Sequence, residues 1–157
     1  MSNYAGCMGV EFRRAVVGDV PAIVAMLADD PLGAARENPG DLATYLDAFG
    51  RIDADPGELL IVADRDGEVV GTLQLTFLSG LSRRGATRAQ IEAVRVRTDV
   101  RSEGLGARLI EWAIAESRRR GCHLVQLTSD NSRTDAQRFY ERLGFTGSHV
   151  GYKLTLV

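Results

Sequence analysis

Hydrophobic and polar residues recur with two different periods along this chain, and each period predicts its own element. Apolar residues return every three to four positions in residues 42–52, which predicts an amphipathic helix. Residues 59–63 and 69–77 are rich in Val, Leu and Ile, and Asp66-Gly67 between them is typical of a two-residue hairpin turn. Helical and strand segments therefore occur together in one chain.

Similar signals divide the rest of the sequence. Gly18-Asp19 followed by Pro21 predicts a helix start with Asp19 as its cap. The remaining expectations are strands at 10–14, 90–97, 122–128 and 151–156, a polar loop at 79–87, and helices over 104–120 and up to 143. The strand at 122–128 is expected to be buried. This order predicts an α/β (α+β) fold, with helices on both faces of one sheet.

Length and composition narrow the classes of protein. A chain of 157 residues suits one domain, here expected over 1–157 with residues 1–9 as a flexible or variable extension. The net charge of −2 indicates neither nucleic acid nor an anionic membrane as a partner. Cys7 and Cys122 are too isolated for a disulfide framework or a metal site. The isolated cysteines lead us to expect no metal, and since no signal peptide or apolar span is visible, we expect a cytoplasmic protein.

Candidate chemistry gathers where a strand feeds a glycine-bearing loop that opens a long helix. The first amides of a helix have no partner inside it, and with the helix dipole they attract anions. Gly104 and Gly106 let a phosphate approach the backbone, and Arg101 adds a cation. The segment matches neither the dinucleotide fingerprint nor the P-loop.

Two motifs resemble those of a known family. Arg101-x-x-Gly104-x-Gly106 is similar to the Q/R-x-x-G-x-G/A signature of the GNAT acetyltransferases. Tyr140-x-x-x-Gly144-Phe145 is similar to the segment on the family's last helix, and the order of elements agrees over nearly the whole chain. The resemblance implies a mixed, twisted sheet that splays in a V between its fourth and fifth strands, where acetyl-CoA lies.

The resemblance also implies which residues hold acetyl-CoA. The pantetheine arm would pair with the backbone of Val94 and Val96, and a bulge nearby would turn an amide toward the acetyl carbonyl oxygen. Arg133 stands where many members carry an asparagine that bonds the cofactor; it could reach a CoA phosphate or the substrate, or lie on the surface. The residues expected at the pyrophosphate are Arg101, Ser102, Glu103, Gly104, Leu105, Gly106 and Ala107.

Two residues are candidates for proton transfer. By resemblance, Tyr140 would protonate the leaving thiolate, although it also fits the apolar stripe of its helix. Glu92 is the candidate base, because period-two counting puts it on one strand face with Val94 and Val96. A structural ion pair of Glu92 with a nearby arginine, or His149 as the base, are the alternatives.

The implied activity is acetyl transfer from acetyl-CoA to a primary amine of a small molecule or peptide, by direct attack in a ternary complex. The alternative is a non-catalytic acyl-CoA-binding sensor with the same fold. Tyr45, Phe49, the 79–87 loop and the last strands are expected to form the acceptor side. Arginines of that loop (Arg83, Arg84, Arg88) would suit an anionic acceptor, whereas Asp29, Asp30 and Glu37 would suit a cationic one. A homodimer is also possible.

Overall fold

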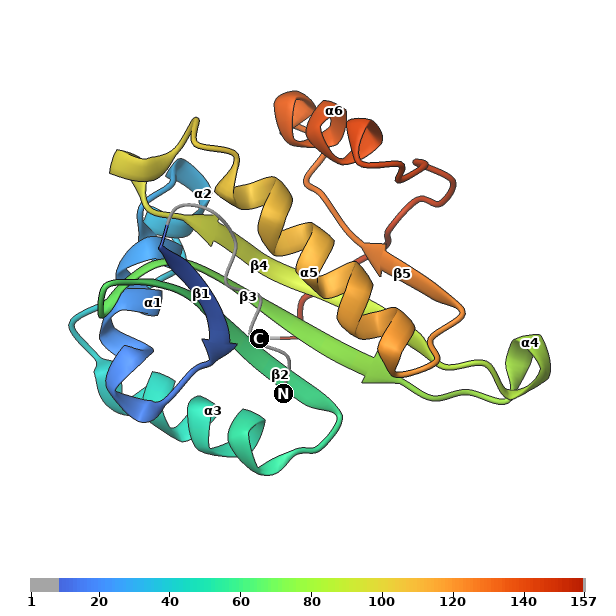
Figure 1. The fold of residues 1–157 in the computed structure, drawn as a ribbon, viewed down its shortest axis with the longest axis horizontal. Coiled ribbons are helices and arrows are strands. Elements are labelled where there is room, and N and C mark those ends of the chain that lie inside the picture. Colours follow the sequence, from blue (N-terminus) through green and yellow to red (C-terminus); the bar gives the residue numbers. More distant parts are fainter. Residues whose placement is uncertain (1–8, 157) are drawn as a thin grey trace. The chain divides into compact units, whose positions relative to one another are not determined.

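The computed structural model describes residues 9–156, which form two compact units that divide between Gln126 and Leu127. The expectation of a single domain stays a prediction, and the predicted extension at 1–9 lies, apart from Gly9, outside the described residues. The elements, drawn in Figure 1, are β1 (Val10–Arg14), η1 (Val17–Asp19), α1 (Val20–Ala28), α2 (Pro31–Ala34), α3 (Leu42–Ala54), β2 (Glu58–Arg65), β3 (Glu68–Leu78), α4 (Ser82–Gly85), β4 (Arg88–Val96), η2 (Thr98–Val100), α5 (Leu105–Arg119), β5 (Leu124–Leu127) and α6 (Thr134–Arg142).

The sheet runs in chain order, β1-β2-β3-β4-β5, and its first four strands are antiparallel neighbours. The predicted hairpin turn is confirmed, because Asp66 and Gly67 both have positive φ, 53° and 86°. The crossover through α5 brings β5 beside the beginning of β4, where the His123 N–H donates to the Thr87 carbonyl at 2.9 Å. The fold is therefore the expected mixed sheet with helices.

Helices cover both faces of β3 because successive residues of a strand point to opposite sides (Figure 1). Leu73 and Leu75 are fully buried on the side of α5, where a Cβ on Gly71 would lie 3.1 Å from Leu109. Thr72, on the opposite face, is buried on the side of α1 and α3. Each buried leucine contributes about 1.5–3 kcal/mol, so this alternation holds the helices in place.

An ion-pair network fixes the start of α1. Asp19 precedes the helix as expected, but its carboxylate does not cap it. The carboxylate instead accepts the Val16 N–H at 2.8 Å and two N–H groups of Arg13 at 2.7 and 3.0 Å. Arg13 also donates to Asp64 on β2 at 2.9 Å. Hydrogen bonding from Arg13 holds the pKa of Asp19 below its usual value, against the opposing effect of burial.

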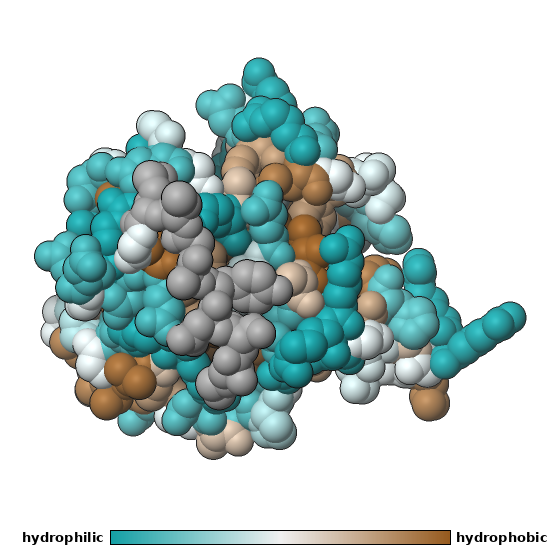
Figure 2. All heavy atoms as spheres, viewed as in Figure 1, coloured by the Kyte–Doolittle hydropathy of each residue, from teal (hydrophilic) through white to brown (hydrophobic). Residues whose placement is uncertain are grey.

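The segment at 79–87, expected to be a loop, contains the short turn α4 at the end of the β3–β4 hairpin. Arg83, Arg84 and Gly85 all have positive φ, between 54° and 73°, so this turn is left-handed. Both arginines are exposed, and Figure 2 shows hydrophilic side chains extending from this tip.

The second unit contains α6 and the segment that follows it. α6 ends in a Schellman motif: the Phe145 N–H donates to the Tyr140 carbonyl at 3.1 Å and the Gly144 N–H to the Glu141 carbonyl at 3.0 Å. Gly144 has a φ of 93°, which favours glycine. Part of the second sequence motif is thus explained by the geometry of a helix end.

Two strand expectations were wrong. Residues 151–156 form no strand, although their apolar residues alternate, because a strand also needs a bonded neighbour. Within the described residues from 143 to 156, no such ladder is present. β5 is shorter than expected, and its residues are half-buried rather than buried.

Candidate functional site

A β-bulge interrupts β4 where the resemblance implies one. Gln74 of β3 pairs with Glu92, but Thr72, two residues earlier on β3, pairs with Arg95. One extra residue therefore stands on β4, and Ala93 has a φ of 53°. This backbone conformation costs an alanine about 1–2 kcal/mol, so the surrounding sheet must hold it. A bulge of this kind turns a backbone amide out of the ladder.

The bulge corrects the predicted position of Glu92. Residues paired directly across antiparallel strands share a face, so Glu92 lies on the face of Gln74, Thr72 and Arg95. It does not share a face with Val96, whose partner Gly71 packs toward α5. Glu92 is exposed, and it accepts a hydrogen bond from Gln90 at 2.8 Å. Arg88, Arg95 and Arg97 are the arginines expected as its ion-pair partners, and none of them is paired with it: Arg95 pairs with Asp30, and Arg97 with Glu68 and Asp99.

The end of β4 is tied to the turn between α1 and α2. Arg95 forms an ion pair with Asp30 at 3.1 Å, and the two side chains are only 19% and 14% exposed. Asp29 bonds to the Thr98 hydroxyl and lies 3.7 Å from the Arg101 guanidinium. These contacts connect the turn between α1 and α2 with β4 and with the residues that follow it, and they give Asp29 and Asp30 local partners.

Residues 101–107, here called the amide loop, lead from η2 into the first turn of α5. Ser102 and Gly104 have φ of 79° and 75°, an alternation that turns successive N–H groups toward one side. Gly104 precedes α5 with no side-chain cap, and the first turn of α5 has no acidic residue. The first intrahelical bond is from the Arg108 N–H to the Gly104 carbonyl at 3.2 Å. The Arg101 N–H already donates to the Thr98 carbonyl at 3.4 Å, so the amides available to an anion are those that follow it.

Two charged side chains of the amide loop already have partners. Arg101 donates to the Val96 carbonyl at 3.2 Å, in addition to its contact with Asp29. Glu103 pairs with Arg65 at 2.5 Å, which raises the pKa of Arg65 and offsets a negative charge close to the amides.

The residues of this region fit acetyl-CoA. The amide loop supplies backbone donors for a pyrophosphate, and a Cβ on Gly104 would meet no atom within 4 Å, so the backbone is open there. Val94 and Val96 are half-buried on the same strand that leads to the loop. The remaining predicted contacts, at Leu105, Gly106 and Ala107, lie in the first turn of α5.

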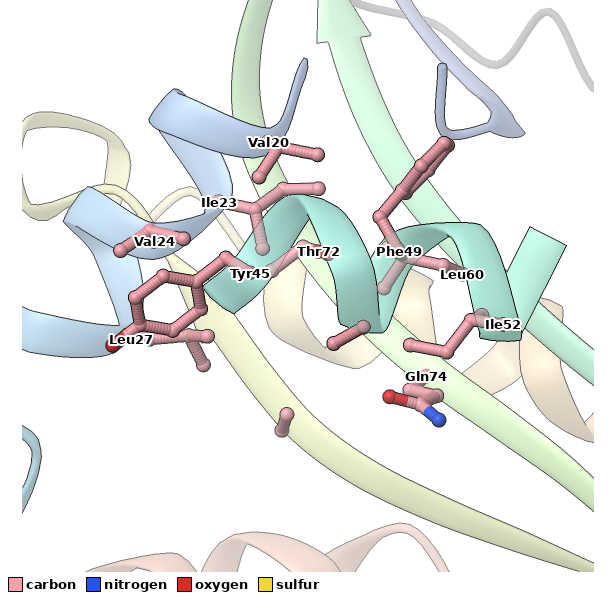
Figure 3. Close-up of a pocket in the computed structure, with 12 residues that line it drawn as sticks. Val20, Ile23, Val24, Leu27, Tyr45, Phe49, Ile52, Leu60, Thr72 and Gln74 are labelled. Atoms are coloured by element: carbon pink, nitrogen blue, oxygen red, sulfur yellow. The ribbon is translucent and has the colours of Figure 1, made fainter. Parts of the chain in front are cut away.

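An apolar pocket of about 100 Å³ opens beside the bulge, on the face of the sheet that carries Thr72 and Gln74. Figure 3 shows it between side chains of α1 and α3 and the sheet, and Ala93 is part of its wall. Tyr45 and Phe49, two predicted acceptor-side residues, line it, whereas no residue of 79–87 does. The lining consists of Val20, Ile23, Val24, Leu27, Tyr45, Ala48, Phe49, Ile52, Leu60, Thr72, Gln74 and Ala93.

Carboxylates hold two of the polar side chains that line this pocket, Tyr45 and Gln74. The Tyr45 hydroxyl donates to Glu37 at 2.8 Å and accepts the Asn38 N–H at 2.8 Å. Gln74 donates to Glu58 at 2.9 Å, and Thr76 donates to the same carboxylate oxygen at 2.9 Å. Sequence reasoning missed Glu58 and Gln74, because only the strand register places them beside the pocket.

Tyr140 and Arg133 belong to the second unit. The Tyr140 ring packs edge-on against Phe139 and Phe145, with centroids 5.2 and 6.0 Å apart. Arg133 is exposed and directly precedes α6. His149, the alternative base, is exposed and hydrogen-bonded to Ser148 at 2.7 Å. The proposed roles of Tyr140 and Arg133 stay predictions.

Other features of the described residues are few. Between residues 9 and 156, no three His, Cys, Asp or Glu side chains are grouped as metal ligands. No helix in this part of the chain is long and apolar enough to cross a bilayer. Cys122 is a free thiol whose pKa is raised by burial, and Cys7 lies outside the described residues.

Comparison with known proteins agrees with this geometry. Residues 21–145 match the model of the acetyltransferase (GNAT) family. The chain is 30% identical to the aminoalkylphosphonate N-acetyltransferase of Salmonella typhimurium, over 93% of this chain and 91% of that protein. It is 30% identical to the glucosamine 6-phosphate N-acetyltransferase of Trypanosoma brucei brucei, over 74% of this chain and 90% of that protein.

Solved structures share the fold as well. A transcriptional regulator from Bacillus halodurans C-125 superposes with a TM-score of 0.91 and 46% identity, covering 94% of this chain and 99% of that one. Since the family model spans most of the sequence and the curated relatives are N-acetyltransferases, this chain belongs to the GNAT family and is an enzyme that transfers acetyl groups to amines.

Proposed function

We propose that the protein transfers the acetyl group of acetyl-CoA directly to the primary amine of a small molecule, with both substrates bound together. The single observation that carries this proposal is the bulge at Ala93. The same strand segment forms part of the apolar pocket and leads into the amide loop. Donor and acceptor can therefore approach each other at one point of β4.

The donor side is built from backbone. Acetyl-CoA supplies an activated acetyl thioester. Amides of residues 101–107 bind its pyrophosphate, the backbone of Val94 and Val96 pairs with the pantetheine arm, and Arg133 contacts a CoA phosphate. An amide released from the ladder at the bulge donates to the acetyl carbonyl oxygen, a contact worth about 3–4 kcal/mol in related oxyanion sites. Holding the two reactants in attack geometry contributes about 7–11 kcal/mol.

Two side chains move protons in this proposal. Glu92 accepts a proton from the acceptor ammonium, directly or through water, because an ammonium has no lone pair for attack. Its position supports this role: it adjoins Ala93 and pairs across the strands with Gln74, which lines the pocket. Tyr140 donates a proton to the leaving sulfur.

The test combines binding and turnover. Acetyl-CoA binding is measured by calorimetry, and thiol release is followed across a panel of primary amines. Glu92→Gln should flatten the acid limb of the pH–rate profile, and Tyr140→Phe should lower kcat with little change in acetyl-CoA affinity. Profiles and kcat identical to the wild type would remove these two residues from the mechanism. Absence of turnover with every amine, despite tight binding, would contradict the enzymatic proposal.

A regulatory role is the second candidate, because the 46% identical relative from Bacillus halodurans is described as a transcriptional regulator. In this role an acyl-CoA-loaded protein would act on a partner without transferring the acetyl group. Ligand binding without thiol release would favour it.

The proposal includes a cytoplasmic location, a possible homodimer, and neither metal, nucleic acid nor membrane as a partner. The net charge of −2 supports the last two points. The relatives named for aminoalkylphosphonate and glucosamine 6-phosphate support a small amine over a protein as the acceptor.

A further inference from the structure

The wall of the apolar pocket is uncharged. None of the described residues that line it is Asp, Glu, Lys, Arg or His, and its polar members are Tyr45, Thr72 and Gln74. The Thr72 hydroxyl donates to the Ile61 carbonyl at 2.9 Å, and the Tyr45 hydroxyl donates to Glu37. Both hydroxyl hydrogens are thus already used. An anionic group placed in this pocket would lose its water and gain few donors in exchange.

The charges next to the wall are mostly negative. Glu37 and Glu58 each accept a hydrogen bond from a wall residue, and Glu92 pairs across the strands with Gln74. On this face of the sheet Arg95 pairs with Asp30, so its charge is offset. Arg88 lies four residues before Glu92 on β4, toward the opposite end of the strand from the bulge.

The size of the pocket limits what fills it. Its volume of about 100 Å³ is well below the ~300–1,000 Å³ of sites that hold drug-sized ligands, so only a short group fits inside it. Val24, Leu27 and Phe49, labelled in Figure 3, are apolar residues of the lining that such a group would contact.

We propose that the acceptor is a primary amine carried on a short, uncharged apolar body, such as an alkyl chain of four to six carbons, and that amines bearing a phosphate or phosphonate are poor acceptors. The inference rests on the proposed function, since it names the substrate class of that site. The apolar body occupies the pocket, and the amine lies at Ala93 beside Glu92. This specificity differs from the acceptors named for the two curated relatives.

The first experiment compares acceptors with the wild-type enzyme. At fixed, saturating acetyl-CoA, kcat/KM is measured for the straight-chain amines from ethylamine to hexylamine and for 2-aminoethylphosphonate. Each methylene that enters the pocket should raise kcat/KM about four-fold, the effect of burying one CH₂. 2-Aminoethylphosphonate should be at least about ten-fold poorer than propylamine, which it resembles in length. A flat alkyl series, or a phosphonate that equals the alkylamines, would overturn the inference.

A matched pair of variants locates the effect. Ala48→Leu places a larger side chain in the pocket, whereas Ala43→Leu makes the same change on the exposed side of α3. Ala48→Leu should remove the advantage of pentylamine over ethylamine, at least about ten-fold, while Ala43→Leu keeps it. Acetyl-CoA affinity and the melting temperature are measured for both, so that unfolding is not mistaken for altered specificity.

The outcomes separate the two proposals. No thiol release with any amine contradicts the proposed function. Turnover with an unchanged alkyl preference in Ala48→Leu, in a folded protein that binds acetyl-CoA, contradicts only the inference about the acceptor.

Discussion

The amide loop and the apolar pocket both adjoin β4, but the loop presents backbone groups whereas the pocket is lined by side chains. The loop is backbone: its donors are N–H groups that positive φ at Ser102 and Gly104 turns to one side. The pocket is side chain, contributed by α1, α3 and three strands. Backbone donors are the same whatever side chains surround them, whereas a side-chain wall changes with each substitution. The loop therefore suits a donor that is common to the family, and the pocket suits an acceptor that can vary.

A negative charge in the first turn of α5 should weaken the binding of acetyl-CoA at the amide loop and leave the apolar pocket unchanged. Ala107→Glu places a carboxylate where the pyrophosphate is expected, and repulsion at close range should weaken acetyl-CoA binding about 100-fold. The same carboxylate complements the helix dipole, so stability should rise by about 0.3–1 kcal/mol. Calorimetric titration and thermal unfolding measure the two effects. Ala115→Glu, also half-buried in α5, is the control, and equal losses of affinity in both variants would refute a site at the helix start.

A fall in pH should destabilise α1, which supplies residues to the pocket, before it affects the amide loop. The network around Asp19 fixes α1, which supplies pocket residues. The folded-state pKa of Asp19 is lowered by Arg13, so its contribution is full above the unfolded value near 3.9 and is lost as the pH falls through the lower folded value.

Asp19→Asn should accordingly cost about 2 kcal/mol at pH 7 and less in acid. Urea unfolding of both proteins at pH 7 and in acid measures this difference in the free energy of unfolding. Asp53→Asn, which removes the exposed partner of Arg14, should cost less than about 1 kcal/mol and is the control. Equal effects of the two substitutions would mean that the Asp19 network contributes no more to stability than an exposed ion pair does.

The smallest effect is expected from the pocket's own polar edge. Tyr45→Phe removes the hydroxyl that joins Glu37 and the Asn38 amide to α3. Loss of about 1 kcal/mol of hydrogen bonding should raise the KM for the acceptor about five-fold and leave the affinity for acetyl-CoA unchanged. Steady-state kinetics with each substrate varied in turn provide the measurement. A parallel loss of acetyl-CoA affinity would show that pocket and loop are not independent.

The sequence by itself determined most of the elements and the position of the amide loop between β4 and α5. Helix periods, the Asp66-Gly67 turn and the glycines at 104, 121 and 144 act over a few neighbouring residues, so a local pattern is enough to predict them. The family signature lies in the same local segments. For this reason the fold class was predicted correctly and the glycine-bearing segment precedes α5 as expected, whereas its binding of acetyl-CoA stays a prediction.

Only the tertiary structure decided how side chains of β4 face the site. Period-two counting puts Glu92 with Val94 and Val96, but one extra residue at Ala93 moves it to the opposite face, beside Gln74. The pairing of β2 with β3 likewise brings Glu58 to the pocket, and the absence of a ladder leaves 151–156 without a strand in the described chain. These features depend on strand register, a property of two chain segments that are distant in sequence, which no pattern within one segment contains.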